Sequence, residues 1–540
     1  MKIFLFVLTI SYSLTVAHMQ TNAQAPNWLW AKSAEGSGIE TGRSIATDAA
    51  GNVVAIGEFG TPSITFGTTV LTNAGILSTN SRDIFIVKYD SVGNMLWVKS
   101  AGGDGEDYGS SICTDANGNI FVTGNFSSDS ITFGTFTLFN DTVWSMYVVK
   151  YDPSGNVLWA KTAKSLWTND GQGISTDASG NVVVTGGFYE PWVIFGSDTL
   201  TSVGSQDFFV VKYDSSGNLL WAKSAGGNSY EFIKSVSVDA SGNILVTGCF
   251  QSSSISFDTT TTLFNAGNLD IFIVKYDASG NVLWAKSSGG SDDESGTSVF
   301  TDSSNNILVT GYFESNSITI GSTTLNNYSY SALFLPTDMF VVKYDSGGNV
   351  LWAKSTGGVE DESGNGITCD QIGNIFVTGS FDSDSVSFGA HTLLNSGDHD
   401  IFVLKYNTSG NEDWATTGNG PGLDEGFAIA TDADGHAIIT GLFGIPTVSF
   451  GTSILNNTGN LDFFVAKLNR SSTTGFNEFS KNDFNIKAFP NPFSTQTTLQ
   501  TETRLLNASV IVYNSVGQIV KRIDNFSGQT IIFRRDKLPS

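Results

Sequence analysis

The sequence predicts an all-β fold: a seven-bladed β-propeller followed by a small Ig-like β-sandwich. Three observations support the propeller. The phrase L-W-A-K and its variants recur at a nearly fixed period, which is the signature of a repeat architecture. Each repeat carries four short apolar segments separated by turn residues, which predicts a four-stranded antiparallel meander. One such strand precedes the first repeat and none follows the last. The repeated tryptophans are Trp30, Trp97, Trp159, Trp221, Trp284, Trp352 and Trp414.

The first 23 residues have the pattern of a secretory signal peptide. Lys2 gives a positive start, an apolar run covers 3–16, and small residues close the segment. We expect cleavage after Ala23, so that the mature chain begins at residue 24. No later stretch has the roughly 18 consecutive apolar residues that a membrane span requires, which predicts that the chain has no transmembrane segment.

The first repeat illustrates the four predicted strands. Strand A covers 44–48, strand B 52–57, strand C 83–90 and strand D 94–99. The links from A to B and from C to D read D-x-x-G-N, where Asp bonds its own turn and Gly supplies positive φ, so each predicts a tight hairpin. Strand B is an unbroken apolar run, which indicates that both faces of the sheet are covered, as in radially stacked blades.

The strand count predicts a closed ring. Strands A and C occur in every repeat, but strand D of the last repeat is missing. The segment 27–32 has the sequence of that missing strand. We therefore expect it to complete the last blade as the outer strand and to leave no unpaired edge. A string of separate small β domains would explain the repeats but not the missing and surplus strand.

These repeats resemble the SBBP β-propeller repeat of secreted bacterial proteins. The resemblance rests on the Asp of strand A, the following G-N, the V-T-G of strand B and the K-Y-D of strand C. It implies a propeller over residues 24–470 and no definite activity. The chain departs from the family in its longer link from B to C, which inserts a small hairpin. The inserted hairpins lie around Phe66, Phe133, Phe195, Phe388 and Phe450.

The composition changes after Arg470, where a polar linker, 471–483, leads into a final segment, 484–540. This segment is similar to the type A C-terminal sorting domain of the type IX secretion system. The resemblance implies export by that machinery to the outer surface of a Gram-negative bacterium, with the propeller as cargo. The chain stops before the last strand of that family, so we expect a truncated sandwich. The motif residues are Pro490, Asn491, Pro492, Phe493 and Gly517, with Leu538 and Pro539 near the end.

The composition excludes a nucleic-acid binder. The 27 basic and 51 acidic residues give a net charge of −24, and the clustered Lys and Arg that neutralise phosphates are missing. With 40% apolar residues the chain has ample material for hydrophobic cores. Its three cysteines, Cys113, Cys249 and Cys369, are too few and too scattered for a disulfide framework. We expect them to be buried as small apolar residues.

One position on the predicted long-loop face is acidic in six repeats and Asn in the seventh. The long-loop face is the side that carries the D-to-A and B-to-C links, opposite the D-x-x-G-N hairpins. Because blades converge at the axis, these side chains either surround the channel mouth, where they suit a hard cation such as Ca²⁺, or cap their own loops. The absence of a D-x-[DN]-x-[DN]-G calcium loop favours caps. The positions are Glu40, Asp107, Asn169, Glu231, Glu294, Glu362 and Asp424.

Aromatic residues that break the repeat pattern form a second candidate site. Trp144 precedes strand C of the second repeat, and Trp167 lies in the loop to the third. Tyr189 and Trp192 lie in the B-to-C insertion of the third repeat. All four are expected on the long-loop face of two adjacent blades. There they suit a sugar ring or a protein hot spot, or they pack the inserted hairpins.

Catalytic motifs are nearly absent. The mature chain has three histidines, His391, His399 and His436, and no H-E-x-x-H, G-x-S-x-G or Cys–His pattern. His436 replaces the Asn of a D-x-x-G-N turn. The sequence therefore predicts a secreted or surface-held protein that binds an extracellular glycan or protein, with no cofactor assigned apart from Ca²⁺. A propeller enzyme that uses two carboxylates on a polysaccharide and a passive spacer remain the alternatives.

Overall fold

The computed structural model describes residues 25–75, 81–189, 191–329, 335–457, 459–470, 486–489, 496–513 and 519–534. The signal peptide, the linker and the motif residues Pro490, Asn491, Pro492, Phe493, Gly517, Leu538 and Pro539 lie outside these ranges. Within them the regular elements are β-strands, and no helix is long and apolar enough to cross a membrane. The chain divides into two compact units, one spanning 22–472 and one containing 473–540.

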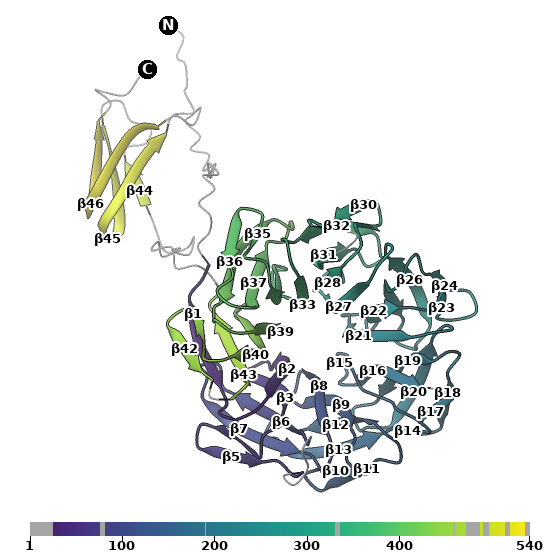
Figure 1. Ribbon diagram of the computed structural model, residues 1–540. Coiled ribbons are helices and arrows are strands. Elements are labelled where there is room, and N and C mark those ends of the chain that lie inside the picture. Colours follow the sequence, from purple (N-terminus) through teal and green to yellow (C-terminus); the bar gives the residue numbers. More distant parts are fainter. Residues whose placement is uncertain are drawn as a thin grey trace. The chain divides into compact units, whose positions relative to one another are not determined.

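The first unit contains seven four-stranded antiparallel sheets within its described residues. They stand in a ring round a central axis (Figure 1), the architecture of a β-propeller. The inner strands, of type A, are β2 (Glu40–Thr47), β8 (Asp107–Thr114), β15 (Gly173–Thr176), β21 (Glu231–Val238), β27 (Glu294–Thr301), β33 (Glu362–Cys369) and β39 (Asp424–Thr431). Strands of type B are β3 (Val53–Phe59), β9 (Ile120–Phe126), β16 (Val182–Tyr189), β22 (Ile244–Phe250), β28 (Ile307–Phe313), β34 (Ile375–Phe381) and β40 (Ala437–Gly444).

The two outer strands of each sheet follow the same plan. Strands of type C are β6 (Asp83–Tyr89), β12 (Ser145–Tyr151), β19 (Gln206–Tyr213), β25 (Asp270–Tyr276), β31 (Asp338–Tyr344), β37 (Asp400–Tyr406) and β43 (Leu461–Leu468). Strands of type D are β7 (Met95–Ala101), β13 (Val157–Thr162), β20 (Leu219–Ala225), β26 (Val282–Ser288), β32 (Val350–Thr356), β38 (Glu412–Gly418) and β1 (Trp28–Ser33).

A small hairpin follows strand B in every sheet. The hairpin pairs are β4 (Ser63–Phe66) with β5 (Thr69–Thr72), β10 (Ser130–Phe133) with β11 (Phe136–Phe139), β17 (Trp192–Phe195) with β18 (Asp198–Thr201), β23 (Ser254–Ser256) with β24 (Thr262–Phe264), β29 (Ser317–Ile320) with β30 (Thr323–Asn326), β35 (Ser385–Phe388) with β36 (His391–Leu394), and β41 (Thr447–Phe450) with β42 (Ser453–Asn456). Only the third, among the described residues, gains an extra strand, β14 (Lys164–Ser165).

The predicted closure of the ring is confirmed. Strand β1 pairs antiparallel with β43, so the last sheet has the order β1-β43-β40-β39. The innermost strands of the first and last sheets also meet, because Thr47 Oγ1 donates a hydrogen bond of 2.8 Å to the carbonyl of Thr431. The N-terminal segment therefore closes the ring as the outer strand of the last sheet, where it pairs with the otherwise open edge of β43.

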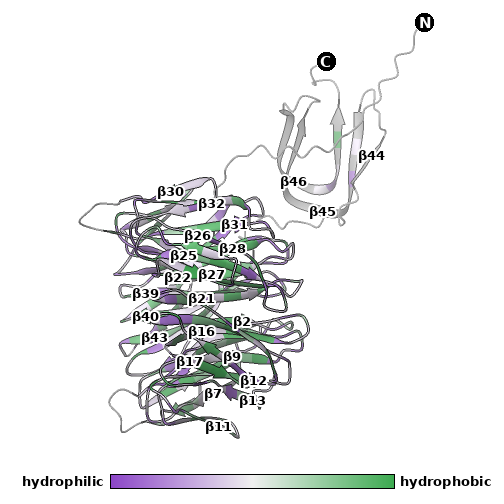
Figure 2. Cartoon of the chain, turned by 90° about the vertical axis from the view of Figure 1, so that its right-hand side faces the viewer, coloured by the Kyte–Doolittle hydropathy of each residue, from purple (hydrophilic) through white to green (hydrophobic). Residues whose placement is uncertain are grey.

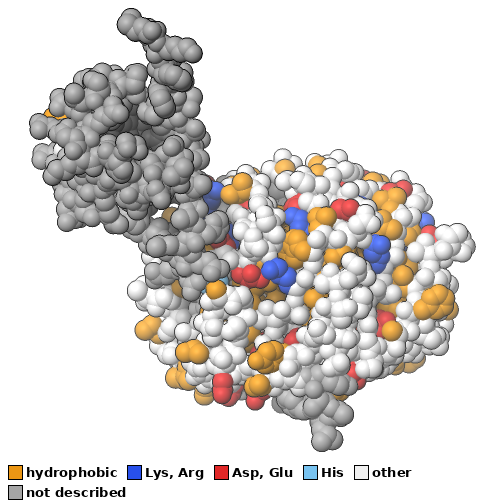
Figure 3. Space-filling model, turned by 90° about the horizontal axis from the view of Figure 1, so that it is seen from above, with side chains coloured by type: hydrophobic (Ala, Val, Ile, Leu, Met, Phe, Trp, Pro, Cys, Tyr) orange, Lys and Arg blue, Asp and Glu red, His pale blue; other side chains and the backbone are white. Residues whose placement is uncertain are grey.

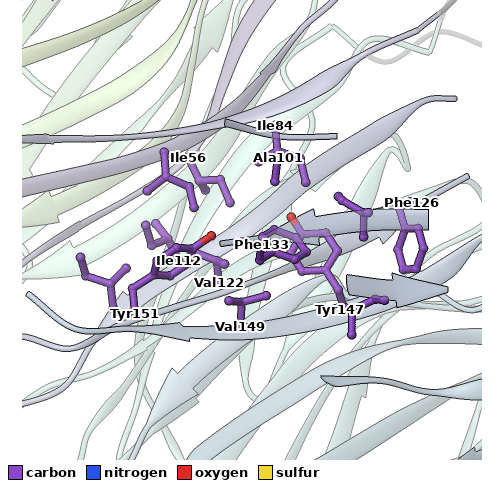
Figure 4. Packing of buried hydrophobic residues seen from close by; sticks show 14 of the residues in the cluster. Ile56, Ile84, Ala101, Ile112, Val122, Phe126, Phe133, Tyr147, Val149 and Tyr151 are labelled. Carbon is purple, nitrogen blue, oxygen red and sulfur yellow. The ribbon is translucent and has the colours of Figure 1, made fainter. Parts of the chain in front are cut away.

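The hydrophobic cores lie between neighbouring sheets. Ile56 and Ile84 of the first sheet pack against Val122 and Tyr147 of the second (Figure 4). Strands of types B and C are therefore buried on both faces, which explains their unbroken apolar runs. In Figure 2 hydrophobic residues follow the strands, whereas hydrophilic residues gather in the links.

Five of the seven repeated tryptophans donate a hydrogen bond to the C-to-D turn of the neighbouring sheet, on the face that carries the D-x-x-G-N turns, which we call the hairpin face. Trp97 Nε1 donates a hydrogen bond of 3.3 Å to the carbonyl of Pro153 in the next C-to-D turn. Its ring lies against Gly155 of that turn, where a Cβ atom would come within 3.1 Å of the indole. Gly155 has a φ of 81°, so the turn needs glycine both for its backbone and for the ring above it. The L-W-A-K phrase is thus a structural signature.

The predicted D-x-x-G-N turns are confirmed. Asp48 accepts hydrogen bonds from the backbone N–H groups of Ala50 and Asn52, each at 3.0 Å. Lys88 of strand C also reaches Asp48, with an Nζ–Oδ2 distance of 2.9 Å. Burial raises the pKa of Asp48, but hydrogen bonds from Asn52 and Lys88 outweigh it, and the pKa lies below its usual value.

Two details of the first unit differ from the prediction. Strand A begins at Glu40 rather than Ser44, because a bulge between Gly42 and Ser44 lets the pairing continue toward the long-loop face. Cys249 and Cys369 are buried as predicted, whereas Cys113 is only partly buried; all three are free thiols.

The described part of the second unit is one antiparallel sheet. It has the order β44 (Ile486–Phe489), β45 (Gln496–Tyr513) and β46 (Ile519–Arg534). The pairing of β45 with β46 is interrupted at several places between Gln500 and Val510. A sandwich needs a second sheet packed on the first, so the predicted Ig-like sandwich remains a prediction.

Candidate functional site

The seven capping positions are buried in their own loops rather than exposed round a channel mouth. Every one of these side chains has a relative exposure of 0%. Each carboxylate lies at the start of an inner strand and folds back over the link that precedes it: the N–H of Gly103 donates to Asp107 at 2.8 Å, and that of Gly290 to Glu294 at 2.8 Å. Full burial contradicts a solvent-facing acidic ring, and the hydrogen bonds fit the capping interpretation. The positions are Glu40, Asp107, Asn169, Glu231, Glu294, Glu362 and Asp424.

Burial changes the acid–base properties of these caps. It raises the pKa of Glu294 and of Glu362 to about 7, and that of Asp424 to about 8, although each accepts hydrogen bonds. A nearby second carboxylate adds to each shift; for Asp424 that neighbour is Asp400. These second carboxylates, at the start of strand C, are residues that the sequence reasoning did not identify.

The structure brings the loops of the four predicted aromatic residues together. The N–H of Asn169 donates to the carbonyl of Trp144 at 3.0 Å, and the N–H of Tyr189 donates to the carbonyl of Thr168 at 3.0 Å. Trp167 therefore lies between the loop that carries Trp144 and the end of strand β16. Its side chain is 55% exposed.

Trp192 belongs to the extra three-stranded sheet β14–β17–β18. There Lys164 pairs with Ile194 and Ser165 pairs with Val193. Continuing that register places Leu166, which is 57% exposed, opposite Trp192. Trp192 is half-buried and packs within the inserted hairpin. Leu166 and Trp167, in the loop that follows β14, are exposed to solvent.

Trp144 and Tyr189 are also half-buried. The Trp144 ring packs against Tyr108 with a centroid distance of 5.6 Å, and Val143 beside it is 56% exposed. These residues and their neighbours define what we call the aromatic surface. It consists of Val143, Trp144, Leu166, Trp167 and Tyr189.

Further aromatic and basic residues border this surface. The Arg82 guanidinium lies 5.8 Å from the centroid of the Tyr108 ring, and Tyr230 stacks on Phe232 with an interplanar angle of 4°. The sequence analysis did not single out Tyr108 or Phe232, although their positions in the repeat are unusual. Tyr108 and Phe232 follow directly on the capping positions Asp107 and Glu231, where other repeats have small or polar residues.

A groove with a volume of about 760 Å³ lies at the junction of the fifth and sixth sheets. It is lined by Tyr328, Asp338, Lys354 and Glu412, and the ion pair of Lys354 with Glu412 has an Nζ–Oε1 distance of 2.8 Å. Because its lining is mostly polar or charged, the groove differs in character from the aromatic surface. On the face drawn in Figure 3, hydrophobic side chains lie scattered among polar ones.

The histidines do not form a catalytic group. Hydrogen bonds from His399 to Asp382 and Glu425 raise its pKa to about 10, so the ring is protonated near neutral pH and is a poor general base. His436 Nδ1 lies 3.0 Å from Asp432 Oδ2 and thus replaces the usual turn asparagine. Asp432, Asp434 and His436 are close enough together to hold a metal, but Lys467 already pairs with Asp432 at 2.7 Å.

Comparison with known proteins finds similarity to a WD repeat-containing protein and to a regulatory protein. The chain is 24% identical to an uncharacterised WD repeat-containing protein of Acanthamoeba polyphaga mimivirus over 81% of its own length and 38% of that protein. It is 29% identical to the regulatory protein FlaEY of Caulobacter vibrioides over 27% of its own length and 15% of that protein. The chain thus matches less than half of each relative.

Solved structures that resemble the chain do so at low sequence identity and with low TM-scores. The WD40 domain of Neurospora crassa Pan2 is 9% identical, with a TM-score of 0.38, over 81% of this chain and 91% of that one. Sqt1 from Chaetomium thermophilum is 8% identical, with a TM-score of 0.36, over 88% and 97%. No model of a known protein family matches the chain. The SBBP and sorting-domain resemblances therefore remain predictions.

Proposed function

We propose that this protein is an exported seven-bladed propeller that binds a protein partner outside the cell through its aromatic surface. The observation that carries the proposal is the exposure of Leu166 and Trp167 in the loop that follows β14, the extra strand that only one inserted hairpin gains among the described residues. An exposed tryptophan among other apolar side chains is typical of an interaction site, because such patches are costly to leave in water.

The neighbours of Trp167 favour a protein over a glycan. Val143 and Leu166 are aliphatic and exposed, and aliphatic side chains provide dry contact area for a protein. A sugar face instead prefers an aromatic ring flanked by hydrogen-bonding groups. The experiment below is therefore designed so that binding of a glycan would contradict the proposal.

We expect replacement of the exposed pair to abolish binding without unfolding the propeller. The double variant Leu166→Ser, Trp167→Ala removes a predicted hot spot, so affinity should fall about 30-fold or more, which corresponds to about 2 kcal/mol. The purified mature chain would be screened by biolayer interferometry against displayed extracellular proteins and against a glycan array.

A matched control removes an exposed aromatic residue elsewhere. Phe264 on β24 is 74% exposed, so Phe264→Ser should keep full affinity, and both variants should keep the melting temperature of the parent. Saturable glycan binding that survives the double variant would refute the proposal. So would equal loss of affinity in the two variants.

We also propose that the type IX secretion system exports the chain to the outer surface of a Gram-negative bacterium. Support comes from the resemblance of 484–540 to its sorting domain. We expect the variant Pro492→Ala, Phe493→Ala, expressed in a host that has this system, to accumulate in the periplasm. The Trp167→Ala variant serves as the control and should reach the surface normally. Equal surface levels, measured by protease accessibility on intact cells, would contradict this route.

A further inference from the structure

Two buried carboxylates meet at six junctions between neighbouring sheets. One is the capping residue of an inner strand, and the other is the Asp that begins strand C of the preceding sheet. All are at most 2% exposed. At five junctions the charge of one member raises the pKa of the other, so the two groups are close. The pairs are Asp83 with Asp107, Asp207 with Glu231, Asp270 with Glu294, Asp338 with Glu362, Asp400 with Asp424, and Asp462 with Glu40.

At two of these junctions both carboxylates have an oxygen atom that finds no donor. Within the described ranges, Asp338 Oδ1 and Glu362 Oε1 have no hydrogen-bond partner, and neither have Asp400 Oδ1 and Asp424 Oδ2. The Asp338 and Glu362 oxygens flank the same link: a Cβ on Gly357 would lie 1.9 Å from Asp338 Oδ1, and a Cβ on Gly358 would lie 3.1 Å from Glu362 Oε1. Buried anionic oxygens without a partner carry a large desolvation cost.

The same propeller neutralises buried carboxylates on its other face with lysine. Lys343 pairs with Asp302 at 3.0 Å and Lys275 with Asp239 at 2.9 Å, and both partners are buried. No lysine or arginine in the described ranges forms an ion pair with the carboxylates of the Asp338–Glu362 and Asp400–Asp424 junctions. The charge at these junctions is therefore balanced either by bound protons or by a cation from outside the chain.

At the seventh junction, between the second and third sheets, both carboxylates of the pair are missing. Both carboxylates are replaced there, one by Ser145 and the other by Asn169. Asn169 satisfies its own polar atoms, because its Nδ2 donates to Ser165 Oγ at 2.6 Å and its Oδ1 accepts from the N–H of Met146 at 2.9 Å. The two carboxylates are therefore either both present or both absent at a junction, and the junction without them still folds.

We propose that the paired carboxylates of the junctions are binding sites for a divalent cation of the Ca²⁺ type, one ion to a pair. Two carboxylates supply the matching charge, and Ca²⁺ accepts oxygen ligands in the irregular arrangements that loops provide, whereas Mg²⁺ demands a near-ideal octahedron. Asp338 lines the 760 Å³ groove described above, which gives the ion a route to that junction. The site is independent of the proposed partner-binding function.

The seventh junction supplies the variant for the test. Asp338→Ser with Glu362→Asn reproduces the residues that this propeller already tolerates at Ser145 and Asn169. We expect isothermal titration of the full mature chain with CaCl₂, after treatment with EGTA, to show several bound ions and a higher melting temperature. The double variant should bind one ion fewer and should remain folded in EGTA.

Two results would overturn the proposal. The first is that millimolar Ca²⁺ neither binds in stoichiometric amounts nor changes the melting temperature. The second is that the double variant binds as many ions as the parent. If the pairs hold protons instead, their raised pKa values contribute stability that is complete below about pH 4 to 4.5 and is lost as the pH rises through about 7. The melting temperature would then fall from pH 5 to pH 8 equally with and without Ca²⁺.

Discussion

Deletion of residues 25–33, which include β1, is expected to leave a chain that no longer forms a stable propeller. Trp30 is buried, and its ring lies 6.1 Å from that of Tyr89 in the neighbouring sheet. Trp28 packs edge-on against Phe450 at 4.8 Å. Truncation of a single buried tryptophan costs about 3 to 5 kcal/mol, and the deletion also exposes the edge of β43. Thermal unfolding and size-exclusion chromatography would show a lost transition and aggregation.

A circular permutant tests whether the loss is due to the missing strand rather than to a shorter chain. In it, residues 28–33 follow Leu468 through a copy of the turn Asp345–Asn349, which joins strands C and D within one sheet and whose Asn349 takes the place of Asn27. We expect this chain to regain most of the parent melting temperature. A deletion variant that melts as the parent does would show that β1 does not close the ring.

The second large effect is expected from Gly311→Ala in the middle of strand β28. A Cβ atom there would lie 1.9 Å from the carbonyl oxygen of Ser295 and 2.9 Å from the ring of Phe340. Neither the backbone of β27 nor a ring packed in the core can move far, so the cost should reach about 3 kcal/mol or more. Urea unfolding followed by tryptophan fluorescence measures it.

Gly67→Ala is the matched control for that substitution. A Cβ atom on Gly67 meets nothing within 4 Å, but the residue has a φ of +58°. Its cost should therefore be only the conformational penalty of about 1 to 2 kcal/mol. Equal destabilisation by the two variants would contradict the explanation of the V-T-G motif as a site of close strand contact.

The sequence predicts the strands well because the constraints on them are local. The D-x-x-G-N turns fix where strands A and C end, and a tryptophan like Trp97 recurs because its ring packs on the glycine of a neighbouring C-to-D turn. The closure by β1 follows from counting strands. Strand β14 was not predicted, because Lys164 and Ser165 become a strand only through pairing with the insertion of the same repeat.

The candidate sites were predictable only in part. The sequence identified Trp167 as an irregularity, and the structure leaves it exposed. It did not show whether Asp107 faces solvent or its own loop, because that depends on how the preceding link folds back. The partner carboxylate Asp83 was overlooked although Ser145 and Asn169, which meet at one junction between consecutive repeats, both depart from the pattern. Recognising such a pair requires knowing which links of adjacent blades meet.

Hydrogen–deuterium exchange of the mature chain, with and without the partner found in the binding screen, tests the central claim most directly. We expect the backbone amides of peptides that cover 141–144 and 164–169, which carry most of the aromatic surface, to exchange more slowly when the partner is bound. The hairpin face should be unchanged, for example at 302–306. Protection confined to the hairpin face, with no change at 164–169, would contradict the claim that this protein binds its partner through the aromatic surface.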